Sequence, residues 1–176
     1  RIGLTEISAV KQTNDHSEIG DINPNVRANV AYNPDSDLIP VTRSNGVLVV
    51  NSAPSSGRVP GQSSVMKLDG WTWEDATLKH PAALNINWPY MYIDYEKNRK
   101  KNDKAQRDEF DHQVREIDQL VRNVRAYHHR KSAKERKAEH KQETDLRLES
   151  MIPFVIYKDP IHVKANDIRQ IEAAVK

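Results

Sequence analysis

The chain has 176 residues, which is enough for one domain with a substantial core but few for two. Its 27 basic and 25 acidic residues leave a net charge of +2, so no global electrostatic attraction to nucleic acid is expected. The lack of cysteine excludes disulfides and thiolate metal sites, and the apolar runs are too short to span a membrane.

Residues 1–95 mix short helix, strand and loop patterns. Residues 33–46 predict a short helix with Asn33 or Asp35 as its N-cap. The β-branched run GVLVVNSAP (46–54) predicts a buried strand, followed by a loop rich in Gly, Pro and Ser that extends to residue 61.

Two further elements are predicted before the composition changes. The sequence SVMKLDG (64–70) predicts a weaker strand that closes in an Asp-Gly turn. Thr72, followed three residues later by Asp75, forms a weak capping box and predicts that a helix begins there. Pro81 is expected to kink or end this helix because proline has no N–H to donate.

Residues 96–150 are much more charged, with 16 Lys and Arg, 12 Asp and Glu, and neither Pro nor Gly. Apolar residues recur at spacings of four and three, which predicts one stripe on a long helix: Phe110, Val114, Ile117, Val121 and Val124. A solvated amphipathic helix or helical hairpin explains this segment best. The many acidic residues and the lack of interleaved aromatic residues argue against specific nucleic-acid binding.

Residues 151–176 predict a strand followed by a helix. The strand is expected at 160–165, and Asn166 or Asp167 is expected to cap the helix that follows. Such a βα unit is typical of a parallel sheet.

Several common motifs are absent from the sequence. Gly57 and Gly61 are four residues apart, but no lysine follows the second glycine, which excludes a Walker-type phosphate loop. There is no Gly-x-Ser-x-Gly nucleophile elbow. The adjacent His128 and His129 would point to different sides of a helix and could not chelate one ion together.

His162 and Lys164 are the most informative polar pair. They are two residues apart on a predicted strand, so their side chains project from the same face. The carboxyl end of a parallel strand is where open-sheet and barrel enzymes bind ligands. The alternative is structural: His162 would be packed inside against a backbone partner, and Lys164 would be neutralised by a nearby acid.

Five stretches of the sequence carry a family pattern in the same order: IGLTEISAV, NPDSDLIPVTRSNGV, SAPSSGRVPGQSSVMKLDGWTWED, LKHPAALNINWP and DPIHVKANDIRQIEAAVK. Together they resemble the amidohydrolase superfamily, and within it the imidazolonepropionase-like amidohydrolases of bacteria. The resemblance covers residues 1–89 and 151–176, so residues 96–150 would be an inserted helical excursion.

The resemblance implies an α/β fold, a partial (β/α)8 TIM-type barrel of the metal-dependent hydrolase kind. Residues 1–95 would hold early barrel strands and the active-site loop, 96–150 a charged helical insertion, and 151–176 a further βα unit. The family uses a divalent metal, usually zinc, to hydrolyse carbon–nitrogen bonds of amides or cyclic amides. The chain begins with Arg1 rather than methionine, so we expect an excerpt of a longer polypeptide whose catalytic acid lies beyond Lys176.

Two positions depart from the family pattern. The second histidine of the expected His-x-His motif falls on Arg1, and the histidine of a later His-Ala-Asn motif falls on Lys164. Neither cation can ligate a metal. Lys164 could be carboxylated and supply oxygen ligands, His162 could replace it from the same strand face, or the protein could bind no metal.

The resemblance also places the loop after the first strand at the mouth of the barrel. Its residues would then shape the substrate opening: Ser55, Ser56, Gly57, Gln62 and Ser63. Trp71 and Trp73 are expected to pack the following helix.

Two functions follow from the resemblance and its departures. The first is a metal-dependent hydrolase of carbon–nitrogen bonds, and the alternative is a catalytically inactive relative that binds a ligand or partner without metal. A third hypothesis is an interaction protein built on residues 96–150.

The expected partners are a small-molecule substrate, the remainder of the parent polypeptide and further copies in an oligomer. No nucleic acid or membrane is expected. Relatives are often exported in bacteria, but these residues do not choose a compartment.

Overall fold

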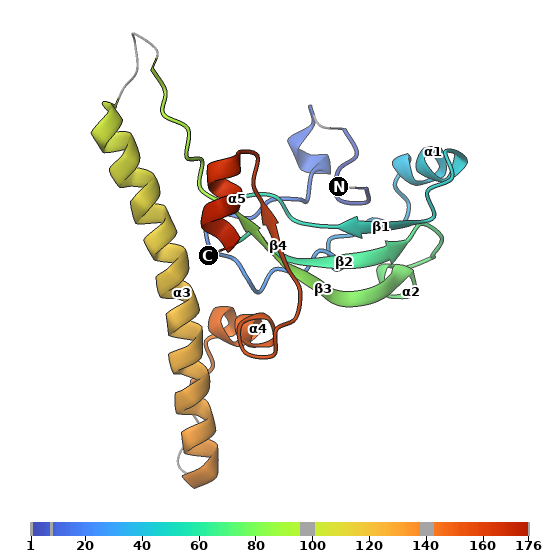
Figure 1. Ribbon diagram of the computed structural model, residues 1–176. Coiled ribbons are helices and arrows are strands. Elements are labelled where there is room, and N and C mark those ends of the chain that lie inside the picture. Colours follow the sequence, from blue (N-terminus) through green and yellow to red (C-terminus); the bar gives the residue numbers. More distant parts are fainter. Residues whose placement is uncertain (1, 8, 96–100, 138–142, 176) are drawn as a thin grey trace.

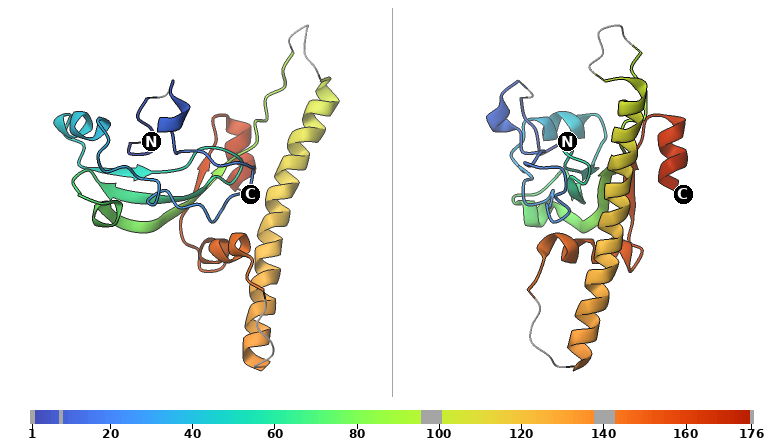
Figure 2. Two further views of the ribbon diagram at one scale, coloured as in Figure 1. Left: turned by 180° about the vertical axis from the view of Figure 1, so that it is seen from behind. Right: turned by 90° about the vertical axis from the view of Figure 1, so that its left-hand side faces the viewer.

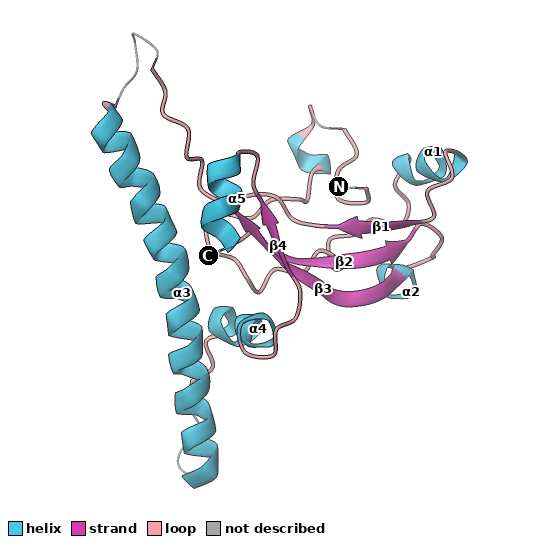
Figure 3. Ribbon diagram, viewed as in Figure 1, coloured by secondary structure: helices cyan, strands magenta, loops and turns pink. Residues whose placement is uncertain are grey.

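The computed structural model describes residues 2–7, 9–95, 101–137 and 143–175. They form a curved sheet of four strands with a long helix along one side (Figure 1). Shorter helices lie around the sheet, as the colouring by secondary structure shows (Figure 3). No helix within these ranges is both long and apolar enough to cross a membrane.

The sheet contains β1 (Val49–Ser52), β2 (Gly61–Lys67), β3 (Thr77–Asn87) and β4 (Ile161–Lys164), in that spatial order. β2 is antiparallel to β1 and β3, whereas β3 and β4 are parallel. The predicted α/β class is confirmed, but the predicted parallel pairing holds only for β3 and β4. Because β1, β3 and β4 run in one direction, their carboxyl ends meet at the same edge of the sheet.

β1 is shorter than the run GVLVVNSAP and lies at the edge of the sheet. Val47, Leu48 and Val49 are 41%, 65% and 48% exposed. The prediction of a buried strand is therefore wrong. The reason is that Val47 and Leu48 precede the strand, and that within β1 exposed residues alternate with more buried ones, so one face of the strand is left open.

The helices of the first 95 residues are η1 (Lys11–Thr13), α1 (Leu38–Ser44) and α2 (Trp73–Ala76). α1 confirms the helix predicted within 33–46. The prediction that Asn33 or Asp35 caps this helix is wrong, because the N-cap is Asp37, which makes no capping hydrogen bond through its side chain. The Asn33 side chain accepts from the Asp35 amide in the preceding turn.

α2 begins where the capping box predicts, since the Thr72 side chain accepts a hydrogen bond from the Asp75 amide at 3.2 Å. The helix ends after one turn, and the chain continues as β3 through Pro81. The pairing register of β2 and β3 shifts on both sides of Val65, close to Pro81. Pro81 therefore lies where the ladder is already irregular, which is why a strand tolerates it.

α3 (Asp103–Lys137) is the long amphipathic helix predicted within 96–150, and α4 (Leu146–Val155) packs against its C-terminal half (Figure 2). The predicted apolar stripe faces the protein, since Ile117 is 8% exposed and Val124 is completely buried. The prediction of an amphipathic helix in this segment is confirmed.

One hydrophobic core joins the sheet to α3 and α4. Its buried members come from all three parts of the chain: Val59, Leu84, Val124, Tyr127, Met151, Ile152 and Phe154. The predicted boundary after residue 150 falls inside α4. The segment 96–150 therefore contributes directly to one of the two hydrophobic clusters that the sheet uses.

β4 and α5 (Ile168–Val175) form the predicted strand–helix unit. The Asp167 carboxylate accepts from the Arg169 amide at 2.8 Å, as expected of a cap. The apolar face of α5 is open, because Ile168, Ile171 and Val175 are 64%, 47% and 82% exposed.

Candidate functional site

A pocket of about 310 Å³ lies at the edge of the sheet where β1, β3 and β4 end. It is lined by Asn51, Ala53, Pro54, Ser55, Asn85, Ile86, Asn87, His162, Val163 and Lys164. The lining combines apolar residues with the carboxamides of three asparagines, one serine, one imidazole and one ammonium group. Such groups at the carboxyl ends of strands are typical of a ligand site in an α/β fold.

The register of β3 and β4 places the polar residues of the pocket in facing pairs. Asn85 lies opposite His162, and Asn87 lies opposite Lys164. Because residues two apart on a strand share a face, all four belong to one surface. From β1, the side-chain nitrogen Nδ2 of Asn51 lies 3.5 Å from Nδ1 of His162. This contact is long, so it orients the His162 ring only loosely.

The asparagines of β3 also hold the surrounding chain. Asn85 Nδ2 donates to the Gly61 carbonyl at 3.0 Å. Asn87 Nδ2 donates to the carbonyls of Ser55 and Gly57 at 3.2 and 2.6 Å. The loop that forms one wall of the pocket is therefore fixed to the strand that forms its floor.

Three of the residues predicted from the sequence come together in this pocket: Ser55, His162 and Lys164. Neither part of the structural alternative is observed. Every residue of β4 is exposed, and His162 meets a side chain rather than a backbone group. Within the described ranges no carboxylate pairs with Lys164.

Ser56 and Gly57 belong to the same loop but face the segment that precedes it. Ser56 Oγ accepts from the Glu18 amide at 3.0 Å and donates to the Glu18 carbonyl at 3.2 Å. Gly57 packs against the carbonyls of Gly20 and Asp21. These two residues shape the loop and do not line the pocket.

Gln62 and Ser63 are not loop residues, which corrects the expectation from the sequence. Both lie in the buried first half of β2. Gln62 Nε2 donates to the carbonyls of Pro24 and Ser150 at 3.1 Å each, and Ser63 Oγ donates to the Ala83 carbonyl at 3.3 Å. Because their side chains form hydrogen bonds within the protein, these two polar residues can lie buried in the sheet.

Asn51, Asn85 and Asn87 are pocket residues that the sequence patterns do not reveal. The signal for the last two is the Asn-Ile-Asn sequence just before Trp88, where alternate residues of a strand share a face. It is visible only if residues 77–87 are recognised as a strand, whereas the sequence predicts a helix that begins at Thr72 and is kinked or ended by Pro81.

The residues present do not by themselves fit a metal ion. Within the described residues, no group of three His, Asp or Glu side chains is arranged to hold one. The pocket offers the His162 imidazole, the Lys164 ammonium group and neutral carboxamides. Zinc sites normally take at least three His, Cys or carboxylate ligands, and an ammonium group cannot be one. Arg1 lies outside the described residues.

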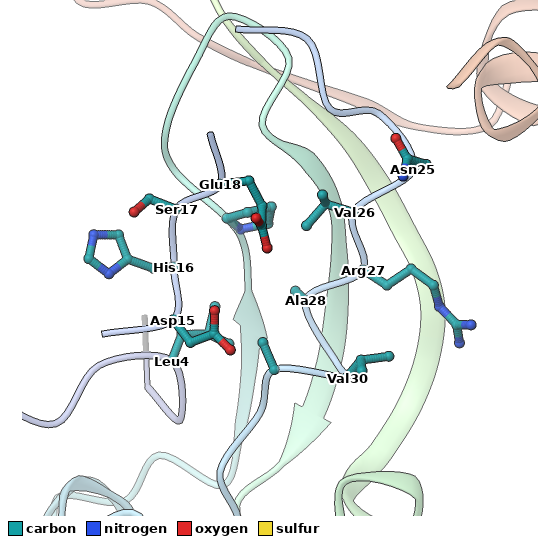
Figure 4. A pocket seen from close by; sticks show the side chains of 12 residues that line it. Leu4, Asp15, His16, Ser17, Glu18, Asn25, Val26, Arg27, Ala28 and Val30 are labelled. Carbon is teal, nitrogen blue, oxygen red and sulfur yellow. The ribbon is translucent and has the colours of Figure 1, made fainter. Parts of the chain in front are cut away.

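A second pocket, of about 330 Å³, lies between residues 15–18 and 25–31 (Figure 4). The carboxylates of Asp15 and Glu18 point into it, whereas the side chains of His16 and Arg27 point away (Figure 4). Its opposite wall is apolar. His16 Nδ1 lies 3.0 Å from the Thr5 hydroxyl, on the side away from the pocket. The pocket is not at the edge where the three strands end.

A serine–histidine pair also exists elsewhere, on the inner part of the sheet. Ser64 Oγ lies 2.8 Å from His80 Nδ1, and Arg27 Nε donates to His80 Nε2 at 3.1 Å. Since Nε2 accepts, Nδ1 of the neutral ring carries the proton and donates to Ser64. His80 therefore cannot act as a base toward Ser64, which is also completely buried.

His80 predicts a pH dependence of stability. Desolvation by burial, together with the neighbouring Arg27, lowers the pKa of His80. Below a pH of about 6.5 the unfolded chain binds a proton that the folded chain does not. Stability should therefore fall as the pH is lowered from 6.5 toward the folded pKa, with a slope of at most about 1.4 kcal/mol per pH unit from this group.

The measurement is urea unfolding of the wild type and of His80→Asn between about pH 7.5 and 5. The variant should lose part of the wild-type slope. Equal slopes for the two proteins would contradict the role assigned to His80.

No protein-family model matches the sequence, and no curated protein matches it. Among solved structures, an amidohydrolase from Thermotoga maritima MSB8 is similar to this chain with a TM-score of 0.82 and 24% sequence identity. The similarity covers 99% of this chain but only 45% of that one, so the chain spans less than half the length of this neighbour. The similarity supports an amidohydrolase-like fold and does not distinguish the imidazolonepropionase-like branch. The chain therefore has the fold of part of an amidohydrolase structure.

Proposed function

We propose that this chain is part of a hydrolase that cleaves carbon–nitrogen bonds in amides or cyclic amides, as imidazolonepropionase-like amidohydrolases do, and that the pocket at the end of β1, β3 and β4 binds its substrate. One observation carries the proposal. In a chain that matches an amidohydrolase structure over 99% of its length, Asn51, Ser55, His162 and Lys164 meet where the carboxyl ends of the strands meet.

The chemistry of these groups suits an amide substrate. The Lys164 ammonium group and the side-chain carboxamide of Asn51 are hydrogen-bond donors. They can hold the carbonyl oxygen of an amide substrate and stabilise negative charge that develops on it. The His162 imidazole can accept or donate a proton beside them. Ser55, on the loop fixed by Asn87, lines the same wall, and its hydroxyl donates to the His16 carbonyl at 3.4 Å.

A divalent metal, zinc by family resemblance, would need ligands from outside the described residues. The proposed roles of Lys164 and His162 do not depend on this metal. Carboxylation of Lys164 would convert an ammonium group into an oxygen ligand and would change its role from donor to acceptor.

A second candidate is a metal-free binding protein on the same fold. The observation that favours it is an ammonium group at Lys164 where the family pattern has a histidine, in a pocket whose described residues form no metal cluster. This candidate predicts ligand binding without turnover.

Lys164→Ala tests the proposed site. The variant should lose about 10²–10³-fold in kcat/KM on a panel of N-acyl amino acids and cyclic amides, the usual cost of removing one charge-stabilising donor. Lys79→Ala is the matched control, because Lys79 is an exposed lysine on β3 outside the pocket. Equal activity of the two variants would contradict the proposal.

Elemental analysis of the protein purified without chelators separates the two candidates. Hydrolase function by the family chemistry predicts about one or two divalent ions per chain. Intact-mass analysis with bicarbonate then shows whether Lys164 carries added carbon dioxide. A protein without metal that binds the amides but does not hydrolyse them supports the second candidate.

A further inference from the structure

Arg58 connects the pocket loop to the long helix. It follows Ser55, Ser56 and Gly57, and its side chain is only 18% exposed. One guanidinium nitrogen donates to Asp21 Oδ2 at 3.1 Å, and another donates to Glu116 Oε2 on α3. The cation is thus shared by two carboxylates from distant parts of the chain.

The backbone of Arg58 is held as firmly as its side chain. Its amide donates to the Asp21 carbonyl at 2.8 Å, and its carbonyl accepts from the Asn87 amide at 2.8 Å. Asn87 also donates to the carbonyls of Ser55 and Gly57 and lies opposite Lys164. A change in the position of Arg58 is therefore transmitted to the wall and the floor of the pocket.

On the helix side, Glu116 is well placed to hold Arg58. Its neighbour Ile117 is buried in the apolar stripe, which fixes α3 at this level. The hydrogen bond from Arg58 lowers the pKa of Glu116 against the opposing effect of desolvation, so the carboxylate stays charged. His112 Nδ1 lies 3.3 Å from the same carboxylate oxygen.

An exposed ion pair would contribute little to stability. Arg58 differs because its side chain is mostly covered, although Asp21 and Glu116 are 65% and 39% exposed, so loss of Glu116 would leave a mostly covered cation with one carboxylate partner. The loop of residues 53–60 contains Arg58, so we expect this loop to change its conformation when a carboxylate partner is lost.

We propose that α3 positions the pocket loop, with Glu116 acting through Arg58 to set the conformation of residues 53–60. The helical segment would then contribute to the structure of the site and would not be a peripheral addition to the fold. The proposal rests on the proposed function only in taking this pocket as the substrate site. Glu116 is a positioning residue and does not touch the substrate.

The test is hydrogen exchange of the whole protein carrying Glu116→Gln, followed by mass spectrometry. Peptides covering 53–60 should exchange about tenfold faster, whereas peptides of α4 and β2 should not change. Asp118→Asn is the matched control, since Asp118 pairs with Arg122 on the exposed side of the same helix. The control should leave the loop unchanged.

Two further readouts separate positioning from a general loss of stability. Glu116→Asp, which keeps the charge, should restore most of the loop protection. The ring resonance of His162 should shift in Glu116→Gln and not in Asp118→Asn, because His162 lies in the pocket. Unchanged loop exchange, or equal acceleration in all peptides, would overturn the proposal. These measurements need no substrate, so their result is independent of whether the pocket hydrolyses amides.

Discussion

Replacing Met151 with alanine is expected to lower the free energy of unfolding by about 2–5 kcal/mol. Met151 is 1% exposed and lies in the core that joins Leu84 of β3 to Val124 of α3. Truncation of the Met151 side chain leaves a cavity between β3, α3 and α4. To fill it, elements from three parts of the chain would have to move together. Few other single substitutions affect the sheet and both helices together.

Urea unfolding of the whole protein, followed by circular dichroism and tryptophan fluorescence, measures this effect. Met151→Leu is the control and should cost less than about 1.5 kcal/mol, because it nearly conserves volume. Both probes should report one transition at the same urea concentration. If the helical signal were lost separately, with the sheet unaffected by Met151→Ala, α3 and α4 would form an independent unit and the shared core would be wrong.

Gly57→Ala is expected to cost about 2–4 kcal/mol, the second-largest effect. Gly57 has a φ of 76°, which disfavours any residue with a Cβ atom. A Cβ at this position would lie 2.8 Å from the Asp21 carbonyl oxygen and 2.9 Å from that of Gly20. Both obstacles are backbone atoms, so the loop would have to move away from the 20–21 segment.

Gly46→Ala is the matched control for the backbone strain. Gly46 has a φ of 85°, but a Cβ there would meet no atom within 4 Å. Its cost should be only about 1 kcal/mol, from the conformational preference alone. The difference between the two variants measures the packing of the pocket loop. Equal costs would show that the loop moves freely and is not held by its neighbours.

The sequence predicted the elements whose signal is local. α3 has an apolar stripe repeated over several turns, and such a stripe needs no knowledge of the partner surface. The cap at Thr72 was also predictable, because its hydrogen bond lies within four residues. These features do not depend on the rest of the fold.

The errors concern features that long-range pairing decides. The capping box at Thr72 and Asp75 predicts a helix that Pro81 kinks or ends, but pairing with both β2 and β4 makes residues 77–87 a strand. GVLVVNSAP has the composition of a buried strand, and only the sheet order shows that it lies at an edge.

The candidate site was predictable only in part, because some of its residues are recognised from local spacing and others depend on long-range pairing. His162 and Lys164 were identified from their spacing on one strand. Asn85 and Asn87 lie opposite them, and this pairing depends on the register between two strands that are about 75 residues apart in sequence. No pattern within β3 alone could reveal it.

The length of α3 has a consequence for how this 176-residue chain would tumble in solution by itself. At 1.5 Å per residue, its 35 residues extend over about 52 Å, whereas a compact chain of 176 residues has a radius of gyration of about 16 Å. Rotation about the helix axis should therefore be faster than rotation across it. The N–H bonds of α3 lie nearly parallel to the helix axis, so they will report the slower correlation time in nitrogen-15 relaxation. Fitted with isotropic diffusion, the helix would falsely appear to undergo chemical exchange.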